Sequence, residues 1–305
     1  MKGSRQEKRI NIRENMTVKE FMNELNGAGF NGKRLAEAVE IYKAMMNDKN
    51  CIKVLGCGGA LIAGGLRNVF VKFIKKGFVD VLIPTGAILT HDLIESFGVH
   101  HYQGSSTTDD VKLSKEETMR IYDVFLPKKG YLKVEEELMK ILPLLPQKEM
   151  SPSEFLYGLG KHMKDENSII KACYENNVKI FCPSITDSVL GFHLWMFSQN
   201  NKLKINPQLD TEQIMNLVWK KEATFGLTIL GGGVGKHYLP LMMQVSGKEI
   251  NYAIQITLDR PEHGGVSGAH LEEAKSWRKL SADALSTTII SDVTIAFPLI
   301  VAALI

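Results

Sequence analysis

Several patterns that would point directly to a function are missing from this sequence. Only four cysteines occur among 305 residues, and none forms a Cys-x-x-Cys pair, which disfavours zinc-binding and thioredoxin-type interpretations. No HExxH or comparable ligand spacing is present, so no metal site is expected. A G-x-S-x-G elbow, which would indicate a hydrolase, is also missing.

Strong charge and long apolar runs are lacking too. The net charge is only +3, with basic and acidic residues intermixed, so no nucleic-acid partner is expected. Residues 1–14 are charged and contain no apolar h-region, so no signal peptide is expected. The apolar stretch 293–305 is shorter than the roughly 20 residues that cross a bilayer. Together with cysteines suited to a reducing compartment, these features predict a cytoplasmic protein without a membrane partner.

What the chain does contain is an alternation of short β-branched runs and stretches with helical spacing. Helical stretches follow most of the runs, for example at 58–76, 271–279 and 293–305. Strands separated by helices predict an α/β fold, with a Rossmann-like, mostly parallel sheet of six or more strands and helices on both faces, in a single domain. The predicted strands are 51–57, 79–84, 178–185, 224–230, 252–258 and 287–291.

The expected domain organisation is a helical extension over residues 1–50, packed on a core domain over residues 51–305. In a parallel sheet, ligands bind beyond the carboxyl ends of the strands. Candidate positions fall at those ends: Gly58-Gly59, Thr85-Gly86, Thr186-Asp187, Gly231 to Gly233, and Asp292.

The strongest local motif is the run of glycines from Gly231 to Gly233, followed by Lys236-His237. A strand enters a glycine turn that opens a helix, and the free N–H groups of a helix N-terminus favour an anionic ligand such as a pyrophosphate. Neither a P-loop nor the G-x-G-x-x-G fingerprint is present. The run therefore indicates a nucleotide site or, equally well, a tight strand–helix turn.

A second motif extends from residue 267 to 279. Glu273 and Trp277 are four residues apart and share a face if the segment is helical. A carboxylate beside an indole can hold an ammonium by charge and by cation–π attraction. Lys279 follows near the end of the predicted helix, where a lysine is usually a favourable C-terminal charge.

The order and spacing of these motifs resemble the deoxyhypusine synthase family. The glycine run with Lys236-His237, the segment 267–269 and the segment 273–279 occur in that order there, and Asp292 precedes an apolar 297–299 tail as in the family. Segments 79–85 and 183–187 fall where the family has similar ones. The resemblance covers roughly residues 50–305.

The resemblance implies NAD-dependent transfer of an aminobutyl group from spermidine or a related polyamine to a lysine of translation initiation factor 5A. Lys279 would form a covalent imine with the aminobutyl group, and His237 would move protons beside the donor. Trp277 would line the polyamine channel, and Glu273 would bind a donor amine. The family assembles as a homotetramer with active sites shared between paired subunits. The residues implied to contact NAD are Gly231, Gly232, Gly233, Thr85, Asp187, Ser267 and Asp292.

Five positions depart from the typical eukaryotic pattern, one of them Leu241 in place of an Asn. Phe192 and Val266 are apolar where those members carry acids, and His91 and His263 stand in place of a Glu and an Asp. This pattern resembles a prokaryotic, often archaeal, branch of the family. Two missing carboxylates leave the donor open among spermidine, agmatine and other diamine derivatives.

The acceptor is open as well. A homospermidine synthase-like transfer to a small diamine such as putrescine would use the same catalytic residues. A plain dehydrogenase would release NADH, and a non-catalytic protein would only bind NAD or a polyamine.

Overall fold

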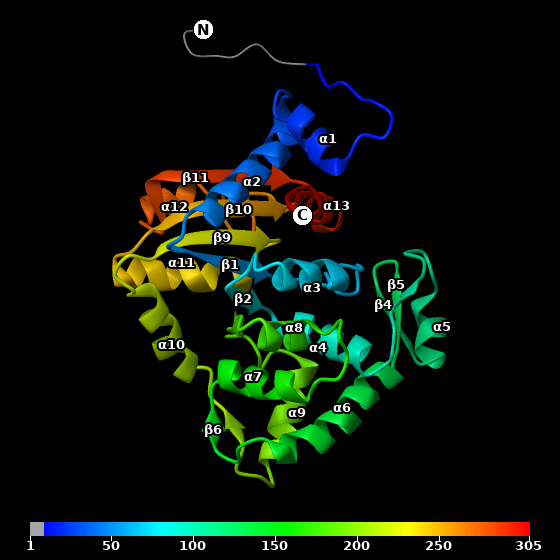
Figure 1. Cartoon of the computed structure of the whole chain (residues 1–305). Coiled ribbons are helices and arrows are strands. Elements are labelled where there is room, and N and C mark those ends of the chain that lie inside the picture. Colours follow the sequence, from blue (N-terminus) through cyan, green and yellow to red (C-terminus); the bar gives the residue numbers. More distant parts are fainter. Residues whose placement is uncertain (1–8) are drawn as a thin grey trace. The chain divides into compact units, whose positions relative to one another are not determined.

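The predicted alternation of strands and helices is present in the structure, a computed structural model that describes residues 9–305 (Figure 1). These residues form two units, each described by itself. The first unit combines the described residues of Met1–Val54 with Val218–Ile305, and the second is Leu55–Leu217. The first eight residues of the predicted 1–50 extension lie outside the described part. The predicted division at residue 50 stays a prediction.

The first unit contains three long parallel strands, β9, β10 and β11, and the helices that pack on them. In β9 and β10 the register aligns Ile256 with Leu230, and in β10 and β11 it aligns Thr257 with Ile290. The carboxyl ends of these strands therefore lie side by side. The elements are α1 Val18–Leu25, α2 Phe30–Asn47, β9 Thr224–Leu230, α11 Val234–Ser246, β10 Ile250–Thr257, α12 Glu273–Ser276, β11 Leu280–Ile290 and α13 Val293–Leu304.

Alternate side chains of a strand point to opposite faces of the sheet, so both faces need to be covered. In the first unit, helices cover both faces of these three strands. On one face α2 lies across β10 and β11 (Figure 1). A Cβ at Gly226 would come within 2.7 Å of the Met45 sulfur, and the Tyr252 hydroxyl donates to Asp48. On the other face Leu227, Ile229 and Ala253 face the cavity bordered by α11.

The second unit packs helices around two short parallel strands, β2 and β7. It also holds an antiparallel sheet of order β3-β5-β4 and the small β6-β8 pair. Its helices are α3 Arg67–Lys75, α4 Gly86–Ser96, α5 Asp110–Lys115, α6 Lys129–Ile141, η1 Leu142–Leu144, α7 Pro152–His162, α8 Ile169–Glu175, α9 Val189–Ser198 and α10 Leu209–Val218, the last ending at the junction. Its strands are β2 Val81–Pro84, β3 Tyr102–Gln103, β4 Thr118–Ile121, β5 Val124–Pro127, β6 Glu149–Met150, β7 Lys179–Ile180 and β8 Lys204–Ile205.

Strand β1, Cys51–Cys57, straddles the junction and completes a six-stranded sheet of order β11-β10-β9-β1-β2-β7. The pairings of β10 with β9 and β11 and of β2 with β7 are parallel. The predicted fold class, α/β with a six-stranded parallel sheet flanked by helices, is therefore confirmed.

Two predicted helices are shorter than the spacing suggested. The helix expected over 58–76 begins only at Arg67, because residues 58–66 form turns that include Gly65 at φ 86°. The helix expected over 271–279 is limited to α12, and Lys279 lies beyond its end. Between residues 9 and 305 no helix is long and apolar enough to span a membrane. All four cysteines are buried thiols.

Candidate active site

The glycine run forms a tight turn between β9 and α11. Gly231 and Gly233 have φ of 84° and 65°, a conformation that side chains disfavour, and a Cβ on either would meet nothing within 4 Å. A Cβ on Gly232, in contrast, would lie 2.2 Å from that of Ser267. No side chain caps α11. The turn therefore combines open space, exposed backbone and a helix N-terminus, as the nucleotide interpretation requires.

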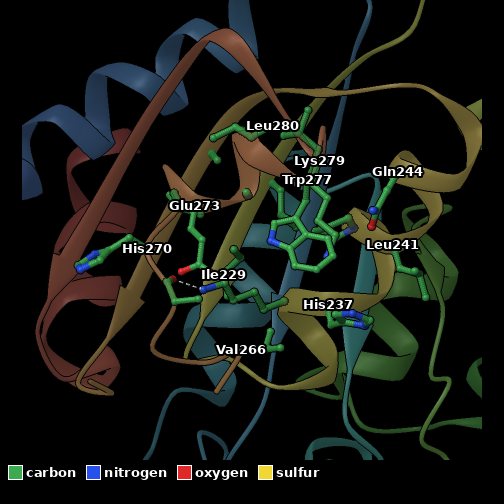
Figure 2. A pocket seen from close by; sticks show the side chains of 18 of the residues that line it. Ile229, His237, Leu241, Gln244, Val266, His270, Glu273, Trp277, Lys279 and Leu280 are labelled. Carbon is green, nitrogen blue, oxygen red and sulfur yellow. Dashed lines mark hydrogen bonds between the residues drawn. The ribbon is translucent and has the colours of Figure 1, made fainter. Parts of the chain in front are cut away.

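Four residues singled out by sequence line one cavity of about 410 Å³ in the first unit. They are His237 on α11, Glu273 on α12, Trp277 at the end of α12, and Lys279 (Figure 2). The structure thus brings together the two predicted catalytic residues and the two predicted substrate-binding residues. Their roles stay predictions. The remaining wall is mostly apolar, with Leu227, Ile229, Pro240, Leu241, Ile250, Ala253, Val266, Leu271 and Leu280 among its residues.

Lys279 and Trp277 are brought onto the same side by an unusual backbone. Arg278 between them has φ 53°, the left-handed conformation, which ends α12 and turns the chain into β11. The Lys279 N–H donates to Ala274 at 3.0 Å, and its carbonyl accepts from Ile250 at 3.1 Å. The Lys279 Nζ lies 5.1 Å from the centroid of the Trp277 ring. Both backbone groups of Lys279 are therefore fixed.

His237 lies in the first turn of α11. Burial lowers the pKa of its imidazole, and the nearby positive charge of Lys279 lowers it further. The imidazole is therefore uncharged at neutral pH and able to accept a proton.

Lys236 is a residue whose role sequence reasoning missed. Its side chain is only 8% exposed, and burial lowers the pKa of its ammonium to about 8, although the carboxylates of Glu273 and Asp259 oppose the shift. Its Nζ donates to the Gln255 side chain and to the Ala269 carbonyl. One sequence signal was available, because Gln255 is an amide flanked by Ile254 and Ile256 in the apolar part of β10.

Ser267 and Asp292, both predicted to contact NAD, lie near the carboxyl ends of β10 and β11. The Ser267 hydroxyl donates to Asp259, whose carboxylate also accepts from His263 at 2.9 Å. These two bonds hold the pKa of Asp259 at about 2. Asp292 is the N-cap of α13, accepting from the Thr294 N–H at 2.7 Å. The cavity lined by Lys279 does not include these two residues or the three glycines.

Thr85 and Asp187 belong to the second unit, where they follow β2 and β7. Thr85 is the N-cap of α4, yet its buried hydroxyl makes no capping bond and has no hydrogen-bond partner among residues 9–305. The backbone carbonyl of Ser184 accepts a hydrogen bond from the Asp187 N–H. The side-chain hydroxyl of Ser184 is also buried and has no partner in the described part of the chain. Two such hydroxyls at strand ends fit a polar ligand that would satisfy them.

Three of the residues that depart from the typical family pattern lie in different environments. Val266 lines the cavity, and Phe192 is 54% exposed on α9. His91 is buried and lies 2.9 Å from His101, which in turn bonds Glu95 at 2.7 Å. Burial, aided by the charge of His101, lowers the pKa of His91 to about 4. Within residues 9–305 no three His, Cys, Asp or Glu side chains gather as a metal site would require.

Comparison with known proteins identifies the class of this α/β protein and then its family. The family model for deoxyhypusine synthase matches residues 20–304. A Methanosarcina mazei protein named probable deoxyhypusine synthase 1 is 42% identical over 289 residues, which cover 95% of this chain and 91% of the relative. An Archaeoglobus fulgidus protein of the same name is 37% identical over 294 residues, with 96% and 95% covered.

A similar fold has been solved by crystallography. The structure of a candidate deoxyhypusine synthase from Entamoeba histolytica superposes with a TM-score of 0.68 at 20% identity and covers 95% of this chain and 93% of that one. At this identity the likeness concerns the fold alone. The family match and the archaeal relatives show that the protein is a transferase-type enzyme and that the chain belongs to the deoxyhypusine synthase family.

Proposed function

We propose that this protein catalyses NAD-dependent transfer of an aminobutyl group from spermidine, or a related polyamine, to a lysine of translation initiation factor 5A. The observation that carries the proposal is the shared cavity of Lys279, Trp277, Glu273 and His237. Transfer of a group between two amines needs a nucleophile to carry the group and a base to move protons, which an amine and an uncharged imidazole can supply. A carboxylate and an aromatic face can hold the cationic donor.

The cavity suits an extended amine. Its apolar walls fit the methylenes of a polyamine, and the Trp277 ring offers a face to a cation. Glu273 offers a carboxylate to a donor ammonium, and it is the one acidic residue among those that line the cavity.

Lys279 would hold the transferred group. Once the donor carbon next to nitrogen has lost a hydride and is at the imine level, the Lys279 Nζ would form a bond to that carbon as the diamine portion leaves, so the aminobutyl group would be carried as an imine on the enzyme. The acceptor amine then attacks the same carbon and releases Lys279. His237, uncharged at neutral pH, takes a proton from the attacking amine and returns one to the departing amine.

NAD, when bound, would supply the acceptor for the hydride lost from the donor carbon next to nitrogen, and that hydride would be returned at the end of the cycle. The residues present fit such a dinucleotide. Gly231 and Gly233 leave open space above an uncapped helix N-terminus. In the second unit, taken by itself, Thr85 has a buried hydroxyl with no partner in the described part of the chain. Ser267, Asp187 and Asp292 complete the proposed contacts, at strand ends or in the turns that follow them.

A homotetramer with shared active sites forms part of the proposal. Trp277 is 54% exposed in the single chain. An imine hydrolyses unless water is kept out. A second subunit closing over Trp277 would supply that exclusion, and light scattering after gel filtration measures the assembly. We place the protein in the cytoplasm with its protein acceptor.

The test uses the purified protein with NAD and spermidine labelled in its aminobutyl portion. It is incubated with translation initiation factor 5A in one reaction and with putrescine in another. Label in the protein acceptor supports the proposal. Label only in a small polyamine supports the homospermidine-type alternative and overturns the protein acceptor. Net NADH release without transfer would indicate a plain dehydrogenase.

A further inference from the structure

A buried polar pair lies beneath the glycine turn. Gln255 is fully buried in the middle of β10, and Lys236 is nearly so on α11. The Lys236 Nζ donates to the Gln255 Oε1 at 3.0 Å. An ammonium has no acceptor, so the oxygen of the Gln255 amide must face it. The amide nitrogen is then directed to the opposite side.

That nitrogen holds two backbone segments together. The Gln255 Nε2 donates to the Gly231 carbonyl at 3.2 Å and to the Ser267 carbonyl at 2.8 Å. Lys236 adds a bond to the Ala269 carbonyl. The pair therefore connects the turn with the segment 267–269, and every donor of the Gln255 amide is used. Since a Cβ at Gly232 would clash with Ser267, the two segments are in direct contact above the pair.

A buried amide and a buried ammonium are costly unless their bonds are satisfied, and here all the backbone bonds end on two segments proposed to bind NAD. We propose that Lys236 and Gln255 are positioning residues, which hold the glycine turn and the segment 267–269 at the spacing that the dinucleotide requires. This inference rests on the proposed function. It assigns neither residue to the chemical step.

The most selective variant is Gln255→Glu. Glutamate has nearly the same volume and still accepts from Lys236, but it cannot donate to the carbonyls of Gly231 and Ser267. Loss of one such bond corresponds to about a tenfold change in an equilibrium constant. We expect the Kd for NAD, measured by titration calorimetry, to rise at least about tenfold. We also expect kcat at saturating NAD to change less than about threefold, because the transfer residues are untouched.

Two further variants complete the design. Lys236→Met removes the bonds to Gln255 and Ala269, and it should weaken NAD binding as well, even if Gln255→Glu does not fold. Lys275→Met is the matched control, because Lys275 pairs with Glu272 on the surface of the same unit. Urea unfolding of each variant separates a loss of cofactor affinity from a loss of stability.

The possible outcomes are distinct. Weaker NAD binding by a Gln255→Glu protein that unfolds at the wild-type urea concentration supports the inference. Wild-type affinity in both folded variants overturns it and leaves the proposed function intact. If the wild-type protein itself does not bind NAD, the proposed function fails first.

Discussion

The Lys279 Nζ lies 5.1 Å from the centroid of the Trp277 ring, and both side chains line the same cavity. The relationship depends on Arg278, whose left-handed backbone reverses the chain between them. A regular helix would place residues two apart on different faces. The indole is therefore positioned both to hold a cationic donor and to shield the amine of Lys279.

Replacing the indole should weaken donor binding. Trp277→Leu removes the ring face, and a cation–π contact at a partly exposed site contributes about 0.5–1 kcal/mol, so the KM for spermidine should rise by at least about two- to fivefold. Trp277→Phe keeps a ring, so its KM for spermidine should lie between those of the wild-type protein and Trp277→Leu. Steady-state kinetics measure this, with Trp219→Leu, an exposed tryptophan in the same unit, as the control. A KM unchanged in Trp277→Leu would contradict the assignment.

The activity should persist in mildly acidic solution. The pKa of His237 lies below its usual 6.5, because its imidazole is partly buried and close to Lys279. The uncharged form, which accepts the proton, is therefore retained down to a pH below 6.5, and the acid limb of kcat should lie there. His237→Gln should lower kcat by at least about 100-fold and remove that limb. A kcat profile from pH 5 to 9 checks both; an acid limb centred above 6.5 would argue against His237.

Lys236 should make stability rise with pH. The pKa of its ammonium is about 8 in the folded protein, against 10.5 ordinarily. Between these values the unfolded chain binds a proton that the folded protein does not, so the free energy of unfolding increases with pH. The full effect is on the order of 3 kcal/mol. Urea denaturation at pH 7.5 and 9.5 should show the increase in wild type and a smaller one in Lys236→Met. Equal pH dependence in the two proteins would exclude this origin.

The second unit should depend on a buried ion pair. Asp92 is fully buried, and its carboxylate accepts from the Arg67 guanidinium at 2.8 Å and from the Ile169 N–H at 3.0 Å. Arg67→Met would leave that carboxylate without its charged partner, which costs about 3–5 kcal/mol. Urea unfolding should show this loss, whereas Lys72→Met, at an exposed position of α3, should have little effect. A loss below about 1 kcal/mol, as at an exposed pair, would contradict the prediction.

Continuous apolar runs made part of the fold predictable. The bounds of β1 and β9 agree with the predicted segments 51–57 and 224–230, because each is an apolar run limited by turn residues. The strand expected over 178–185 is limited to β7, Lys179–Ile180, and the strand expected over 287–291 begins already at Leu280. The 271–279 segment was harder, since its helical spacing does not reveal that Arg278 reverses the chain. Local pattern carries no signal for such a reversal at a non-glycine residue.

Part of the candidate site was predictable because its residues lie in sequence motifs. His237, Glu273, Trp277 and Lys279 fall in two motifs that resemble those of the deoxyhypusine synthase family, and the fold joins those motifs in one cavity. The partners of Gln255, by contrast, come from a turn and a loop on either side of it in sequence, and they meet only once β9 and β10 are paired. The pairing of His91 with His101 likewise arises only from the folded α4 and the turn that follows.

The central claim is a covalent bond between the aminobutyl group and Lys279, and trapping tests it most directly. Wild-type protein is incubated with NAD and labelled spermidine, reduced with borohydride, digested and analysed by mass spectrometry. The account predicts an aminobutyl adduct on Lys279, with no adduct and no transfer in Lys279→Arg. An adduct on another lysine such as Lys236, or transfer that continues in Lys279→Arg, would contradict it.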